Sequence, residues 1–195
     1  MKNIFIVAIL TLTTFVFSSF GKISAQSYRN PSRGIYDLTE VNLGYGLQGD
    51  TQPNVVGYSG LTTLLGYWFN PKVAGGAGVG IFAYNGSNAV PVYLEGGYYF
   101  NEFGLGKMRF FFKADAGLLL RINSSSAQTS FWGDPNIPQT RFIGNPLAGI
   151  MIPIGHHKDV SISLGFYTQW DPNNQDNTQN SFVNFINAKV GVRFY

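Results

Sequence analysis

Residues 40–48 of this chain read EVNLGYGLQ, and the character of their side chains alternates at every second position. Positions 41, 43, 45 and 47 are apolar, whereas the positions between them are polar or glycine. Residues 160–170, VSISLGFYTQW, show a similar alternation near the other end of the chain. Successive side chains of a β-strand point to opposite faces, so this period of two predicts strands with one apolar face.

The alternation recurs along the chain and predicts eight strands. The segments lie at about 38–48, 60–69, 73–84, 90–100, 108–121, 141–152, 159–170 and 183–195. Each is long enough to cross a bilayer, which takes about 9–11 residues of a tilted strand. An even number of strands is usual in single-chain bacterial barrels. The sequence therefore predicts an all-β fold, an eight-stranded antiparallel up-and-down transmembrane β-barrel over residues 38–195.

The connections between these segments sort by length. Three are long and polar, at 49–59, 123–140 and 171–181, and three are short turns, at 70–72, 101–107 and 153–158. The connection at 85–89 is short although it falls on the side of the long ones. Long loops outside the cell and short turns in the periplasm are typical of outer-membrane barrels, so we expect both termini of the chain in the periplasm.

The composition points away from an ordinary soluble domain. Charged residues make up 12% of the chain, against about 25% in typical soluble proteins. The 13 lysines and arginines are scattered, with a net charge of +3, and no run of them could follow a phosphate backbone. This argues against nucleic-acid binding. Because the chain has no cysteine, disulfides, thiolate metal sites and an N-terminal lipidated cysteine are excluded.

Residues 1–25 have the features of a secretory signal peptide. Lys2 supplies a positive charge, residues 4–20 are apolar or hydroxylated without any charge, and small residues precede Ala25. This order predicts cleavage after Ala25 and export of a mature chain that begins at Gln26. Residues 26–37 are then expected to form an N-terminal periplasmic segment before the barrel.

Glycines decide which face of the strands points inward. Eleven of them share a face with the polar residues: Gly44, Gly46, Gly66, Gly76, Gly78, Gly80, Gly97, Gly117, Gly149, Gly165 and Gly191. The interior of an eight-stranded barrel is just wide enough for side chains to fill it. Inward glycines leave room for large neighbours such as Tyr93 and Tyr167, so we expect the polar face inside and the apolar face on lipid. A soluble lipocalin-like binding barrel, with the apolar face inside, is the alternative.

The same alternation places a group of charged side chains in the lumen: Glu40, Glu95, Lys113, Asp115, Arg121, Lys189 and Arg193. Buried charges are tolerated when they are paired. Neighbouring strands predict a pair between Glu95 and Lys113, and closure of the last strand on the first predicts Glu40 with Lys189 or Arg193. A structural network is one interpretation of this set, and an ion pathway through a narrow pore is the other.

No pattern indicates catalysis, a metal or a cofactor. The glycines of residues 75–80 lack the spacing of a nucleotide-binding loop. His156 and His157 are adjacent, lie in an expected turn and have no further ligands nearby. No serine, histidine and acid are brought together by the strand pattern. We therefore expect a protein that is not an enzyme, with no catalytic residue and no cofactor.

One long connection carries two aromatic residues, Phe131 and Trp132, between polar neighbours. If they are exposed, they are candidates for contact with a surface partner, because exposed apolar patches mark interaction sites. Folding back onto the mouth of the barrel is the alternative.

Three stretches resemble a known group of proteins: GYWFNP at 66–71, PVYLE at 91–95 and VGVRFY at 190–195. With the signal peptide, they are similar to the small outer-membrane β-barrel proteins of Bacteroidota, which are broadly OmpA-like or porin-family barrels. The resemblance implies contact with outer-membrane lipid and lipopolysaccharide. It also implies insertion by the barrel assembly machinery, which reads a C-terminal strand that ends in an aromatic residue. Here the apolar face ends at Phe194, and Tyr195 follows it.

Together these features predict an integral outer-membrane protein with a non-catalytic structural or surface-interaction role through its extracellular loops. A narrow pore for small solutes and the soluble binding barrel are the alternatives. The sequence assigns neither a ligand nor an oligomeric state.

Overall fold

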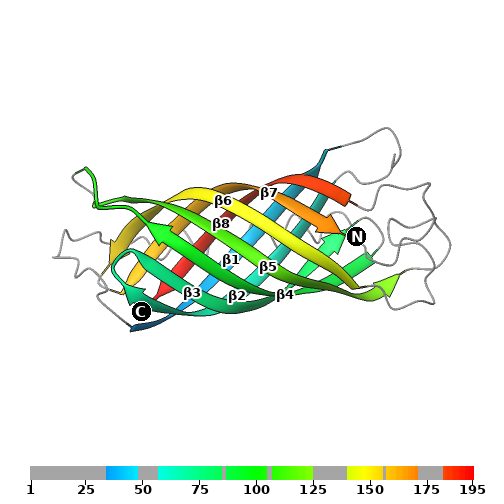
Figure 1. The fold of residues 1–195 in the computed structure, drawn as a ribbon, viewed down its shortest axis with the longest axis horizontal. Helices are drawn as coiled ribbons and strands as arrows, with labels where there is room; N and C mark the ends of the chain where they lie inside the picture. The colour runs from blue at the N-terminus through cyan, green and yellow to red at the C-terminus, as the bar shows by residue number, and fades with distance from the viewer. Residues whose placement is uncertain are drawn as a thin grey trace, which may run out of the picture.

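The computed structural model describes residues 34–47, 57–84, 87–104, 107–124, 140–155, 157–170 and 182–195. They form eight strands: β1 (Gly34–Gly46), β2 (Gly57–Asn70), β3 (Val73–Tyr84), β4 (Ser87–Tyr99), β5 (Arg109–Ser124), β6 (Thr140–Gly155), β7 (Lys158–Trp170) and β8 (Phe182–Phe194). Each strand pairs antiparallel with the next one, and β8 pairs back onto β1, which closes the barrel (Figure 1). The predicted eight-stranded antiparallel barrel is confirmed.

Closure gives every strand a hydrogen-bonded neighbour on both sides, so the sheet has no free edge. The β1–β8 ladder runs from Asp37 opposite Phe194 to Gly46 opposite Phe185. A barrel that pairs all its strands in this way has no exposed row of backbone donors and acceptors, which a lipid environment requires. Within the described residues, no helix is long and apolar enough to cross a membrane.

The strand boundaries differ from the predicted ones mainly at the start of the barrel. β1 begins at Gly34 and not at residue 38, so residues 34–37, which were expected in the periplasmic segment, belong to the first strand. They pair with residues 65–68 of β2. The alternation missed them because Tyr36, an aromatic residue, is buried inside while the charged Asp37 is exposed. The expected signal peptide at 1–25 lies outside the described residues.

The two ends of the barrel carry different sets of connections. The turn end carries the connections at 71–72, 100–108 and 156–157, together with the start of β1 and the end of β8. The loop end carries the connections at 47–56, 85–86, 125–139 and 171–181.

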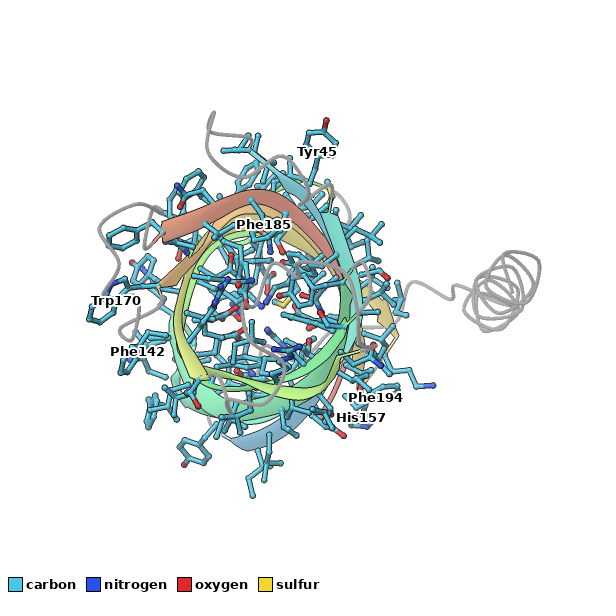
Figure 2. All side chains as sticks on the ribbon, turned by 90° about the vertical axis from the view of Figure 1, so that its right-hand side faces the viewer. Tyr45, Phe142, His157, Trp170, Phe185 and Phe194 are labelled. Atoms are coloured by element: carbon cyan, nitrogen blue, oxygen red, sulfur yellow. The ribbon has the colours of Figure 1, made fainter. Side chains whose placement is uncertain are left out.

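The two faces of the wall have opposite character. Large apolar side chains cover the outside, where Leu65 and Leu94 are each 67% exposed and Phe112 is 59% exposed. Tyr45, Phe142, Trp170 and Phe194 likewise project outward in the view along the barrel (Figure 2), whereas the buried Phe185 belongs to the lumen. The expected direction, polar face in and apolar face out, is confirmed. It argues against the lipocalin-like alternative, which needs the reverse.

Inward glycines lie directly opposite inward rings on the neighbouring strand. In five of these pairs the ring lies over the glycine: Tyr36–Gly66, Tyr58–Gly44, Phe82–Gly60, Tyr93–Gly78 and Phe111–Gly149. In each pair a Cβ on the glycine would come within 2.6 Å of a ring atom. The rings therefore lie across the backbone of their glycine partners, which is how so narrow a lumen holds so many of them.

We predict that Gly60→Ala destabilises the barrel by about 1–3 kcal/mol, the usual cost of overpacking. Its new methyl group would meet both Phe82 Cδ1 at 2.1 Å and the backbone oxygen of Ile81 at 2.5 Å. Gly96→Ala is the matched control, because a Cβ there meets nothing within 4 Å. The urea concentration at which half of the protein loses its folded band on an unheated gel measures both variants. Equal midpoints for the two would contradict the close contact.

Candidate functional site

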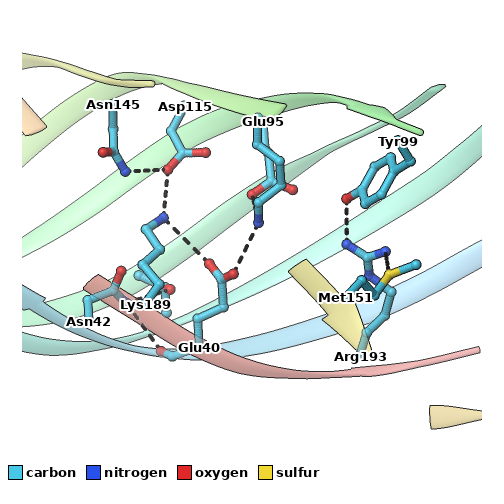
Figure 3. Close-up of polar contacts among 11 residues, drawn as sticks. Glu40, Asn42, Glu95, Tyr99, Asp115, Asn145, Met151, Lys189 and Arg193 are labelled. Carbon is cyan, nitrogen blue, oxygen red and sulfur yellow. Dashed lines mark hydrogen bonds and ion pairs between the residues drawn. The ribbon is translucent and has the colours of Figure 1, made fainter. Parts of the chain in front are cut away.

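The middle of the lumen holds a network of charged side chains (Figure 3). Lys113 Nζ lies 2.9 Å from Glu95 Oε2 and 3.1 Å from Glu40 Oε1. Lys189 Nζ lies 2.7 Å from Asp115 Oδ2 and 3.5 Å from Glu40 Oε2. All five residues are buried, and Glu40 joins the two lysines into one continuous network. The network therefore ties β1, β4, β5 and β8 together across the lumen.

Two of these contacts are the predicted neighbouring-strand pairs, Glu95 with Lys113 and Glu40 with Lys189. The other two cross the lumen, since neither β5 and β1 nor β5 and β8 are paired in the sheet. Asn145 adds a further contact, because its side-chain amide donates to Asp115 Oδ2 at 2.8 Å. These cross-lumen pairs therefore join strands that the sheet itself does not pair.

Arg193, the alternative partner expected for Glu40, forms a second layer toward the turn end. Its Nη2 donates to the Tyr99 hydroxyl at 2.6 Å and its Nη1 contacts Met151 Sδ at 3.0 Å (Figure 3). The guanidinium carbon also lies 4.5 Å from the ring centre of Tyr36, 5.2 Å from that of Trp68 and 5.0 Å from that of Tyr99. A cation enclosed by ring faces is stabilised without a carboxylate. This layer joins residues of β1, β2, β4, β6 and β8.

A third layer, made of aromatic rings, lies toward the loop end. The ring of Tyr58 stands 4.8–5.4 Å, centre to centre, from the rings of Phe82, Tyr84, Tyr167 and Phe185. These residues come from β2, β3, β7 and β8, so the cluster spans the lumen from wall to wall. All five are buried. Together these three layers of side chains form the filled lumen.

Three buried charges were not predicted: Arg109, Arg141 and Asp159. Arg109 Nη1 donates to the Pro71 backbone oxygen at 3.3 Å, and Arg141 Nη1 donates to Gln169 Oε1 at 3.4 Å. All three lie at the first or second residue of a strand, and continuing the alternation to the strand ends would have identified them. Among the predicted lumen charges, Arg121 alone is only half-buried, close to the loop end of β5.

The last two residues bind the end of β8 to the turn end. Phe194 faces outward, and the ammonium of Lys158 lies 5.4 Å from the centre of its ring. The Tyr195 hydroxyl donates to a carboxylate oxygen of Asp159, and its backbone N–H donates to the His157 oxygen at 3.1 Å. The proposed assembly signal is thus split between a lipid-facing ring and an inward anchor.

Other candidate residues fall in two groups. Phe131, Trp132 and His156 lie outside the described residues, whereas His157 is exposed in the connection between β6 and β7. In the part of the chain that the structure describes, no group of three histidine, aspartate or glutamate side chains could hold a metal ion.

We predict that Lys113→Met destabilises the barrel by about 3–5 kcal/mol, because it leaves Glu40 and Glu95 buried without their shared cation. The double variant with Glu95→Gln should recover part of this loss by removing one uncompensated carboxylate. Lys158→Met is the control, since Lys158 is exposed. Urea midpoints of the folded band measure all three variants. A Lys113→Met midpoint equal to that of Lys158→Met would contradict the network.

Comparison with known proteins supports the fold. No protein-family model matches the chain, and no curated protein matches it. Solved structures do match, at low sequence identity. Neisserial surface protein A is 12% identical, with a TM-score of 0.54, and the match covers 84% of this chain and 98% of that one. OprG from Pseudomonas aeruginosa is 9% identical, also with a TM-score of 0.54, over 86% and 98% of the two chains.

The outer-membrane enzyme PagL also matches, at 16% identity over 79% of this chain and 97% of its own, with a TM-score of 0.48. The fold alone does not decide whether this chain catalyses a reaction. What the closed barrel and these matches together establish is the architecture: the chain has the eight-stranded β-barrel fold of outer-membrane proteins.

Proposed function

We propose that this protein is an integral, non-conducting outer-membrane barrel that serves a structural or surface-interaction role through its long connections. The observation that carries the proposal is the filled lumen, closed by rings, by cross-lumen ion pairs and by the enclosed Arg193. In this proposal the signal peptide at 1–25 exports the chain, and the barrel assembly machinery inserts it. The likeness to Bacteroidota barrels is part of the same proposal.

The outer face supports insertion in a membrane. Among the described residues, the exposed charged side chains are Asp37, Lys72, Lys107 and Lys158, and all of them lie at or near the turn end. Between the two ends the outer face is apolar. At the loop end, Trp170 stacks between Phe142 and Phe182, at ring-centre distances of 5.3 and 6.4 Å. Aromatic girdles at the membrane surfaces are typical of such barrels.

The filled lumen favours a structural role over a pore. A narrow pore needs a continuous polar path, but Lys113 and Lys189 reach across the lumen to carboxylates on unpaired strands. A ring cluster closes the loop end and the Arg193 layer closes the turn end. A binding barrel of the lipocalin type would need an apolar lumen, and here charged residues occupy its middle.

The non-catalytic part of the proposal is argued from the described histidine and carboxylate side chains. His157, the one histidine among the described residues, is exposed in a connection at the turn end. The buried carboxylates Glu40 and Glu95 are held by lysines, and this arrangement serves ion pairing more than proton transfer to a substrate.

The purified protein is inserted in a planar bilayer, and labelled protein confirms its density there. We expect it to give no discrete conductance steps. The physical reason is that three layers of side chains would all have to move for ions to pass. A porin inserted by the same procedure is the positive control. Reproducible, ion-selective conductance steps from the wild-type barrel would contradict the proposed non-conducting role and favour the narrow pore.

A second experiment tests on which side of the membrane the long connections lie. An epitope tag inserted within residues 125–139 should bind antibody on intact cells, whereas a tag at the connection at 71–72 should bind only after the cells are opened. The reverse pattern would contradict the proposed orientation.

A further inference from the structure

An apolar groove of about 450 Å³ lies on the outer face of the barrel where β5 and β6 pair. Its lining includes Phe100, Phe110 and Phe112 on one side and Ala148 and Ile150 on the other. The small side chain of Ala148 creates the depth. Along the wall Ala148 lies between two large outward neighbours, Phe112 of β5 and Leu164 of β7.

The groove extends toward the turn end of the barrel. Phe110 is the second residue of β5, and Phe103 of the preceding connection stacks on its ring at 4.4 Å between centres, with the planes 7° apart. Phe100 contacts Phe112 edge-on at 5.7 Å. These rings give the groove an apolar wall that continues past the start of β5 into the connection between β4 and β5.

Exposed positive charge gathers at the same end. Each of the three connections there has an exposed lysine in it or directly beside it: Lys72, Lys107 and Lys158. The one half-buried acid of the β4–β5 connection, Glu102, faces Arg109 at 3.8 Å. Lys158 lies against the outward ring of Phe194, which shows a lysine of this end reaching along the lipid-facing surface. Such lysines attract anionic headgroups.

Lys107 occupies a backbone conformation that would suit glycine better. Its φ is +50°, in the left-handed region where a side chain is disfavoured. Its ammonium forms no ion pair among the described residues, and its backbone begins the short return that leads to Met108 and β5. A lysine at a position that favours glycine indicates that its ammonium group contacts a molecule outside the protein.

From the groove, the lysines and the strained Lys107 we infer that this face holds one anionic glycerophospholipid of the periplasmic leaflet. One acyl chain lies in the groove over Ala148, and the phosphate lies beside Lys107. The inference rests on the proposed membrane insertion. It names a lipid and not a protein because the groove is apolar, opens on the outer face and lies toward the end of the barrel where the exposed lysines gather.

Native mass spectrometry of the full mature protein tests this, after release from detergent micelles doped with equal amounts of palmitoyl-oleoyl phosphatidylglycerol and phosphatidylcholine. We expect one retained phosphatidylglycerol in preference to phosphatidylcholine. Lys107→Gly should reduce that preference about fivefold, the factor for one lysine beside an anionic surface. This variant also relieves the left-handed strain, so it should fold at least as well. Ala148→Phe should fill the groove and abolish retention.

Two matched controls keep the test specific. Lys72→Gln removes a lysine from another connection, and Ala77→Phe enlarges an outward alanine that lies between Leu65 and Leu94 on the neighbouring strands. Both should retain phosphatidylglycerol like the wild type.

Equal retention of the two phospholipids, equal effects of Ala148→Phe and Ala77→Phe, or preferential retention of added lipid A would each overturn the inference. Such a result in a barrel that still inserts and does not conduct leaves the proposed function standing. A chain that stays in aqueous buffer without detergent would instead refute the proposed function.

Discussion

Closure of β8 onto β1 is the constraint on which the rest of the structure depends. It removes the sheet edge, and with eight strands it leaves a lumen only as wide as its own side chains. Several large inward rings fit because the neighbouring strand on one side offers no side chain, as Tyr58 does over Gly44. The same narrowness lets Lys113 reach from β5 to Glu40 on β1. The register of the wall and the chemistry of the lumen therefore have a common cause.

The alternation of side chains made most of the wall predictable. It yields the strand number, the order of the strands and the inward set that includes Glu95 and Lys113, because these depend only on parity and on adjacency in sequence. The cross-lumen contact between Lys189 and Asp115 depends on the stagger of the strands, which parity does not encode. The start of β1 was missed because Tyr36 and Asp37 reverse the expected polarity. Phe131 and Trp132 remain predictions, since they lie outside the described residues.

The inner and outer faces of the wall carry different kinds of side chain. On the inner face several polar groups pair with each other: Arg193 donates to the Tyr99 hydroxyl, and Asp115 contacts both Lys189 and Asn145. The outer face keeps its charges to the turn end and is apolar elsewhere.

The central claim is that lipid covers the outside of the barrel while side chains fill the inside. The chain has no cysteine, so single cysteines can report on each face. Leu94→Cys lies on the outer face and Ser163→Cys on the buried inner face. In vesicles, a spin label at 94 should collide with oxygen more than with an aqueous nickel chelate, and the thiol at 163 should resist a water-soluble thiosulfonate while the barrel is folded. Collision of the label at 94 with the chelate, or rapid reaction at 163, would contradict this account.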